Sequence, residues 1–277
     1  NLKNAPADWL NALKWDGRPR LDELMGTGFG AYYTPERAEY LAAVGRAFFC
    51  GMVARVLDPG CQFDYMLILE GPQGNLKTSA LRTIGGPYFI ECPESFDSKD
   101  FFLVLNGYFL VEIAELHHLN KSQVERVKSI ITCTKDRYRA PYDRHAADHL
   151  RQCVLVGTTN RSDWNRDDTG ARRFLPVACT KIDLDWLAQN RDPLFAEAVH
   201  NYRHNHRWWT LPWDAAQAEQ EARFNFDAWQ EQIETWLNQQ IIGPDTTFRM
   251  TQILEEAVKK HPSEHDPYSQ QRVAAIL

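Results

Sequence analysis

The stretch from residue 66 to residue 86, MLILEGPQGNLKTSALRTIGG, constrains the fold more than any other part of the chain. It joins a short apolar run to a glycine-rich turn, and a Lys-Thr pair then begins a helical pattern. A buried strand that leads through a tight turn into a helix is the first half of a strand–helix–strand unit, whose strands run parallel. The stretch therefore predicts an α/β domain with a mainly parallel sheet.

The following residues agree with this fold class, because strand-like apolar runs alternate with helical patterns as far as residue 180. Asn120 is a candidate N-cap for the second helical pattern. We expect strands at 65–70, 88–92, 109–113, 153–158 and 174–178, and helices at 77–84 and 120–132.

Three regions follow from these patterns. Residues 1–60 form an N-terminal helical region, in which Thr34 and Pro35 begin a long helix. Residues 61–180 form the α/β core. Residues 181–277 form a C-terminal helical region rich in Trp and Gln, and we expect it to end in a partial winged helix.

Composition limits the class of partner and the compartment. Hydrophobic residues make up 44% of the 277 residues and no long apolar run lacks charges, so we expect no membrane contact. The net charge of -6 means that any contact with nucleic acid needs a local basic patch, or copies of it in an oligomer. Six cysteines without a C-x-x-C pair fit buried thiols in a reducing cytoplasm. The chain does not begin with Met, which indicates a piece of a longer protein.

The glycine-rich turn follows the phosphate-binding pattern G-x-x-x-x-G-K-[ST] at Gly71, Lys77 and Thr78, but Leu76 replaces the second glycine. In such a loop, backbone N–H groups at a helix N-terminus surround phosphate oxygens. Leucine costs about 1–2 kcal/mol there if the position needs a positive φ, and little if it does not. A tight strand–helix connection without a ligand is the alternative. The predicted ATP-binding residues are Gly71, Pro72, Gln73, Gly74, Asn75, Leu76, Lys77, Thr78 and Ser79.

Two acids follow on the strand GYFLVEIAEL. In a nucleotide hydrolase, one carboxylate helps to hold Mg²⁺ and another polarises the attacking water. Alternation along the strand places Glu112 and Glu115 on opposite sides, and Glu115, at the strand end, is the better general base. Glu112 either assists catalysis or forms a structural ion pair. We predict that Thr78 and Glu115 hold Mg²⁺.

The strand CVLVGT delivers Asn160 to its carboxyl end, where open α/β sheets bind ligands. Asn160 could orient the attacking water or contact the γ-phosphate, and a turn-capping role is the alternative. Arg172 and Arg173 follow in TGARRF. They suit an arginine finger supplied to a neighbouring subunit, and solvated surface arginines are the alternative.

A basic segment precedes that strand, and Pro141 near its middle predicts a hairpin turn. Cations interleaved with Tyr138 and Tyr142 suit contact with single-stranded nucleic acid, although neighbouring aspartates leave a merely solvated hairpin as the alternative. The predicted nucleic-acid contacts are Lys135, Arg137, Arg139 and Arg144, with Arg151 in the same basic run.

Four segments in this order resemble the virulence-associated protein E family of phage and prophage replication proteins. They are FDYMLILEGPQGNLKTSALRTIGG, GYFLVEIAEL, DRYRAPYDR and LVGTTNRSDWNRDDTGARRFLPV, and LKWDGRPRLDEL at residues 13–24 fits as well. The resemblance covers residues 13–178. The missing second glycine, at Leu76, departs from the family pattern. Ala114, directly before Glu115, departs from the paired acids found in many motor proteins.

The resemblance implies a P-loop NTPase of the AAA+ or superfamily 3 helicase type, with a parallel sheet core, ATP and Mg²⁺ as cofactors, and a hexameric ring. It implies that Lys77 and Thr78 bind the phosphates, that Glu115 activates water, and that Asn160 is the sensor. Arg172 or Arg173 would be the finger. Single-stranded or forked DNA and a primase or another replication protein are the implied partners.

These expectations describe an ATP-hydrolysing DNA helicase or translocase subunit of phage or prophage replication. The alternative from a different class is a nucleotide-gated module that binds DNA or protein with little turnover, because Leu76 disables hydrolysis. A small-molecule kinase would share the loop but gives no reason for Asn160, Arg172 and Arg173.

Overall fold

The computed structural model describes residues 4–92, 101–139, 143–165, 171–204, 207–223, 228–240 and 247–277. The chain divides into two compact units, Asn1–Phe224 and Asn225–Leu277. The boundary falls inside the predicted helical region 181–277. It differs from residue 180 because α6 (Leu184–Arg203) packs against α2 (Pro35–Leu57), and α7 (Trp213–Glu221) packs against β7 (Phe174–Ala178).

The first unit contains a five-stranded sheet in which every neighbouring pair is parallel, in the order β2-β3-β6-β1-β7. All five predicted strands are present, and the α/β class is confirmed. Strand β6 lies between β1 and β3, so one strand separates the strand before the glycine-rich loop from the strand that carries the predicted acids. The strands are β1 (Met66–Glu70), β2 (Phe89–Glu91), β3 (Leu110–Ile113), β6 (Val154–Thr159) and β7.

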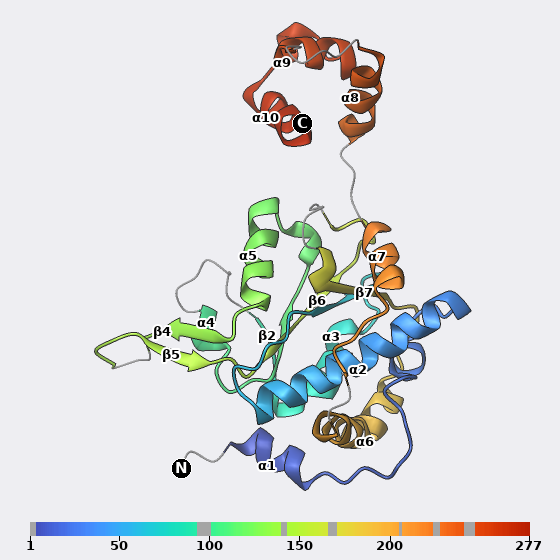
Figure 1. Ribbon diagram of the computed structural model, residues 1–277, viewed down its shortest axis with the longest axis vertical. Helices are drawn as coiled ribbons and strands as arrows, with labels where there is room; N and C mark the ends of the chain where they lie inside the picture. Colours follow the sequence, from blue (N-terminus) through green and yellow to red (C-terminus); the bar gives the residue numbers. More distant parts are fainter. Residues whose placement is uncertain are drawn as a thin grey trace. The chain divides into compact units, whose positions relative to one another are not determined.

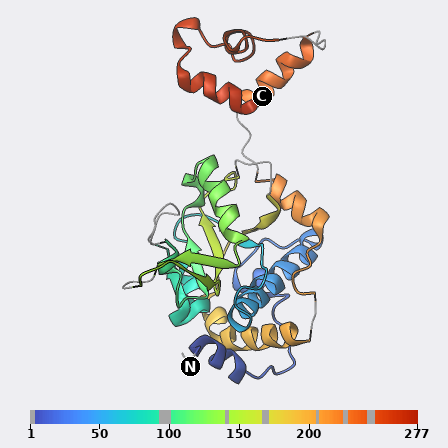
Figure 2. The same ribbon diagram turned by 60° about the vertical axis from the view of Figure 1, so that its left-hand side comes forward.

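Helices cover both faces of this sheet (Figures 1 and 2). The two faces follow from the alternation in β1, since Leu67 and Leu69 join one buried cluster while Met66 and Ile68 join the other. Helices α1 (Ala5–Ala12), α2, α3 (Lys77–Gly85) and α6 contribute to the first cluster, and α4 (Phe101–Val104) and α5 (Lys121–Ile131) to the second. Short helical turns lie at Leu24–Gly28, Gly86–Tyr88, Leu116–His118 and Ala171–Arg173.

Both predicted core helices are present, and their ends lie within one residue of the predicted ones. Helix α3 begins at Lys77, and α5 follows Asn120, whose side chain accepts a hydrogen bond from the Gln123 backbone while the Gln123 side chain binds the Asn120 backbone. This reciprocal pair satisfies two N–H groups at the start of α5. The capping prediction is therefore confirmed.

Helix α2 is long and apolar enough to span a membrane by length and composition alone, with a mean hydropathy of 1.5. However, 83% of the most apolar 18-residue stretch of this helix is buried inside the protein. Its Phe48, Phe49 and Val53 side chains lie in the core beside the sheet. Core packing therefore accounts for its apolar character.

The predicted hairpin is present as two antiparallel strands, β4 (Lys135–Tyr138) and β5 (Ala147–Leu150), which form a sheet of their own. The predicted turn at Pro141 lies outside the described residues. The hairpin connects α5 to β6, so it lies in the chain between β3, which carries Glu112, and β6, which Asn160 directly follows.

The described residues of the second unit form helices and the segments that connect them. Its core gathers Ile233, Trp236, Leu254 and Val273. The predicted partial winged helix remains a prediction, because the described residues of this unit contain helices and turns without a strand. The elements are α8 (Ala228–Gln239), α9 (Met250–Gln252), a π-helical turn (Ile253–Ala257), a 3₁₀ turn (Pro262–Glu264) and α10 (Pro267–Ile276).

Candidate functional site

The glycine-rich loop, Gly71–Ser79, connects the carboxyl end of β1 to the first turn of α3. Three of its residues have positive φ: Gly71 at 153°, Gly74 at 83° and Leu76 at 58°. A Cβ on Gly71 would lie 2.8 Å from the carbonyl oxygen of Cys179, so this position has no room for a side chain. Leu76 occupies the left-handed conformation that the second glycine of the pattern would tolerate without strain.

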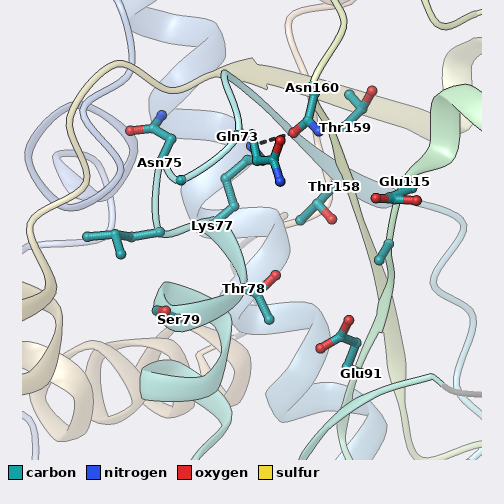
Figure 3. A pocket seen from close by; sticks show the side chains of 13 residues that line it. Gln73, Asn75, Lys77, Thr78, Ser79, Glu91, Glu115, Thr158, Thr159 and Asn160 are labelled. Atoms are coloured by element: carbon teal, nitrogen blue, oxygen red, sulfur yellow. Dashed lines mark hydrogen bonds between the residues drawn. The ribbon is translucent and has the colours of Figure 1, made fainter.

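Lys77 points into the loop rather than into solvent. Its Nζ donates to the carbonyl oxygens of Gly71 (2.6 Å) and Pro72 (3.0 Å) and to Oδ1 of Asn160 (3.2 Å), the contact drawn in Figure 3. Burial lowers the pKa of Lys77. The structure therefore joins the predicted loop lysine to the predicted sensor residue across two neighbouring strands.

Glu112 lies beneath the start of α3 and is fully buried. Its Oε1 accepts hydrogen bonds from the hydroxyls of Thr78 and Thr158, each at 2.8 Å. Its Oε2 has no hydrogen-bond partner among the described residues, and burial raises the pKa of this carboxyl. The structural ion pair that the sequence left open for Glu112 is not found within the described part of the chain.

Glu115 does not share this environment. Strand β3 ends at Ile113, and Glu115 has a φ of 55°, so the strand alternation used to place it does not reach this residue. Its carboxylate is 65% exposed and lies 3.6 Å from Nε2 of His118. The structure therefore pairs the Thr78 hydroxyl with Glu112, whereas the predicted magnesium pair was Thr78 and Glu115.

Lys77, Thr78, Glu115 and Asn160 line one pocket of ≈ 330 Å³ at the carboxyl ends of β1, β3 and β6 (Figure 3), whereas the fully buried Glu112 is not among its lining residues. In Figure 3, Glu115 lies across the pocket from the loop, and Asn160 lies close to the loop residue Gln73. Sequence reasoning missed Thr158 and Glu91, whose side chains also line the pocket. The predicted residues at this pocket are Gln73, Gly74, Asn75, Leu76, Lys77, Thr78, Ser79, Glu115 and Asn160.

The pocket has the chemistry of a magnesium site only in part. Within the described ranges, no group of three or more His, Cys, Asp or Glu side chains is placed to hold a metal. The Thr78 hydroxyl and the buried Glu112 carboxylate are nevertheless hard oxygen ligands, and Oε2 of Glu112 has no hydrogen-bond partner in the described part of the chain. They fit an Mg²⁺ ion that takes its remaining ligands from water and phosphate.

Arg172 and Arg173 lie near the amino ends of the strands, at the opposite end of the sheet from the glycine-rich loop. Phe174 of β7 pairs with Met66, the first residue of β1, so the two arginines lie beside the start of β1 while the glycine-rich loop follows its end. With 5 residues in β1 and about 3.3 Å per residue, the two ends of this strand are roughly 16 Å apart. Arg172 and Arg173 instead line a separate hollow with Asp64, Tyr65 and Trp213.

The hairpin presents a smaller basic patch than the sequence indicated. Lys135, Arg137, Arg139 and Arg144 are exposed, as predicted for the nucleic-acid contacts. Arg137 is ion-paired with Asp148 at 3.0 Å. Arg151 is buried and forms a two-pronged ion pair with Asp136, so it does not belong to the surface patch.

The family model described as virulence-associated protein E-like domain matches residues 10–227. No curated protein is significantly similar to the chain.

Solved structures show a similar fold. The apo structure of the NrS-1 C-terminal region superposes with a TM-score of 0.54 at 15% sequence identity, covering 96% of this chain and 65% of that one. A second form of the same region gives a TM-score of 0.51 at 14% identity, with coverages of 96% and 64%. This chain therefore spans less than two thirds of either neighbour.

Proposed function

Because the chain belongs to the virulence-associated protein E-like family, we propose that it is an ATP-hydrolysing subunit that acts on DNA in phage or prophage replication. The observation that carries the proposal is the meeting of three predicted elements in one pocket. Lys77 reaches Asn160 at 3.2 Å, and Thr78 reaches Glu112 at 2.8 Å. A ligand-free strand–helix connection gives no reason to bury a lysine and a carboxylate beside the same turn.

ATP is the proposed substrate and Mg²⁺ its companion ion. The carbonyl oxygens and the Asn160 amide that bind Lys77 are acceptors that phosphate oxygens can replace, so the ammonium is already directed to the position where phosphates would lie. Thr78 and Glu112 would hold Mg²⁺, and the bound ion would neutralise charge that develops on the phosphates.

The protein groups divide the remaining work. Asn160 donates through its amide to hold the attacking water or the outermost phosphate. Glu115, exposed on the pocket wall, accepts the proton of that water as general base. We assign the metal role to Glu112 because it contacts Thr78. We keep Glu115 as the general base because its carboxylate lies on the pocket wall, away from the hydrogen bonds that Thr78 and Thr158 make to Glu112.

We further propose that the sites are completed between subunits of a ring, for which a hexamer is the expectation. Arg172 and Arg173 lie about 16 Å from the end of the sheet that carries the glycine-rich loop of their own subunit. They would therefore contact the nucleotide of a neighbouring subunit. The exposed cations of the hairpin, Lys135 and Arg139 among them, would contact single-stranded or forked DNA. A primase or another replication protein as partner and a cytoplasmic location complete the proposal.

Two inactive variants test the shared site. Lys77→Ala has a defective loop but intact arginines, and the double variant Arg172→Ala, Arg173→Ala has the reverse. Mixing them should restore part of the ATPase rate, because some interfaces then combine an intact loop with intact arginines. If light scattering shows that the mixture assembles but its ATPase rate is not restored, the proposal that neighbouring subunits share a site is refuted. Lys14→Ala, an exposed lysine outside the pocket, is the matched control.

The nucleotide-gated binding module remains the second candidate, because Leu76 is held in a left-handed conformation within the loop. ATP hydrolysis with and without single-stranded DNA separates the two. DNA-stimulated turnover that rises steeply with protein concentration and is lost in Lys77→Ala and Glu115→Gln supports the motor. Tight ATP binding without turnover, with turnover restored by Leu76→Gly, supports the gated module.

A further inference from the structure

Glu70 is a buried acid that the proposed reaction does not use. It is the last residue of β1 and directly precedes Gly71, whose carbonyl oxygen binds Lys77. Its side chain is 3% exposed, on the face of the sheet that Met66 and Ile68 share. A charge in this position is costly unless it is paired and hydrogen-bonded.

Arg223 supplies that partner from 153 residues away. Its Nε and Nη2 bind Oε1 and Oε2 of Glu70, each at 3.0 Å, and Trp164 donates to Oε1 at 2.7 Å. The remaining Nη1 of Arg223 binds Glu219 at 2.6 Å. Glu219 in turn receives a two-pronged contact from Arg37 of α2. Planar fork geometry of this kind fixes orientation as well as distance.

The backbone of Arg223 makes a second connection to the pocket. Its carbonyl oxygen accepts a hydrogen bond of 3.1 Å from the backbone N–H of Asn165. Asn165 and Trp164 belong to the segment that leaves β6 after Asn160. Arg223 therefore connects the base of the glycine-rich loop with the segment that follows the proposed sensor.

Arg223 also lies next to the boundary between the units. The first unit ends at Phe224, one residue later, and the second begins at Asn225. In the sequence, the second unit thus begins two residues after the residue that holds Glu70.

We propose that Arg223 is a positioning residue for the glycine-rich loop and couples the nucleotide site to the second unit. The coupling between the nucleotide site and the second unit rests on the proposed nucleotide binding. The positioning of the loop by Arg223 through Glu70 does not depend on it. A shift of Arg223 moves Glu70, and with it Gly71 and the carbonyl oxygen that positions Lys77. Linkage makes the effect reciprocal, so a nucleotide on the loop also stabilises the residues around Arg223.

The variants are chosen to keep the chain folded. Arg223→Lys retains the charge but cannot bind Glu70 and Glu219 with one fork. The double variant Glu70→Gln, Arg223→Met removes both buried charges, so neither is left unpaired. Arg203→Lys, on the exposed side of α6, is the matched control.

Hydrogen exchange without nucleotide is measured first, on peptides covering residues 70–76. Both test variants should exchange about tenfold faster there than the wild type and Arg203→Lys, which corresponds to about 1.4 kcal/mol. Amides in the middle of α2 report global stability and should change less. Exchange in 70–76 equal to that of the wild type in both variants would overturn the proposal.

Binding of a fluorescent ATP analogue with Mg²⁺ is measured next. The Kd should rise about tenfold in Arg223→Lys, again about 1.4 kcal/mol. The bound analogue should slow exchange of residues 219–223 and 228–230 in the wild type and not in the variants. An analogue that binds the wild type without this slowing refutes the coupling. A wild type that binds no analogue refutes the proposed function, while faster loop exchange in the variants would still support the grip of Arg223.

Discussion

Leu76 offers the sharpest test of how the glycine-rich loop is built. The residue has φ 58° and ψ 20°, a conformation that costs an L-residue about 1–2 kcal/mol relative to its ordinary one. Leu76→Gly removes that cost together with the side chain, which is 48% exposed. Leu76→Ala removes the same side chain beyond Cβ but keeps the strain. The pair of variants therefore isolates the backbone conformation.

The expected difference follows from two opposing effects. Relief of the strain favours Gly by about 1–2 kcal/mol, and the greater freedom of Gly in the unfolded chain opposes it by about 0.5–1 kcal/mol. Leu76→Gly should therefore be more stable than Leu76→Ala by about 0.5–1 kcal/mol. In a helix the order is reversed, so Ala218→Gly in α7, an exposed helical position, should destabilise by about 0.8–1 kcal/mol.

Native-state hydrogen exchange of the β1 amides is the suitable assay, because it reports the free energy of unfolding of the first unit alone. Two compact units would otherwise contribute to one denaturation curve. An alanine variant as stable as the glycine variant would show that the left-handed conformation of Leu76 carries no strain, and the reasoning would be refuted.

Three further results are expected. Burial raises the pKa of Glu112, so the folded chain holds the carboxyl proton more tightly than the unfolded chain does. The free energy of unfolding should therefore fall as the pH rises from the pKa of an ordinary glutamate through the pKa of Glu112 in the folded chain. Glu112→Gln should flatten this part of a plot of unfolding free energy, from urea denaturation, against pH. Arg151→Met should destabilise the first unit by about 3–5 kcal/mol, as measured by native-state hydrogen exchange of the β1 amides, because it leaves Asp136 buried and unpaired; adding Asp136→Asn should recover most of the loss. Arg139→Ala should weaken binding to single-stranded DNA and lower the salt slope by about one, and Arg137→Ala, whose ion pair already neutralises it, should do less; equal effects in a fluorescence titration would contradict this difference.

The sequence alone determined the α/β class, the five strands of the parallel sheet, the hairpin strands and the cap of α5. Each of these depends on neighbours in the chain. Burial on both faces makes a parallel strand an almost continuous apolar run, as in residues 66–69 of β1, and a capping box needs only Asn120 and Gln123. The loop that follows β1 was found for the same reason, since its glycines and Lys77 are adjacent in sequence.

Tertiary structure decided which groups meet. Extending strand alternation to Glu115 failed because β3 ends at Ile113, so the acid beside Thr78 is Glu112. Arg151 was read as part of a basic surface because the sequence could not show that Asp136 holds it in the interior.

The pairing of Glu70 with Arg223 joins residues 153 positions apart. No local pattern marks it, because each residue alone is compatible with an exposed position. Only the packing of α7 against the sheet brings the two charges together and excludes the water that would otherwise separate them. The sequence thus determined the elements and the loop, and the long-range packing determined the partners of their charged side chains.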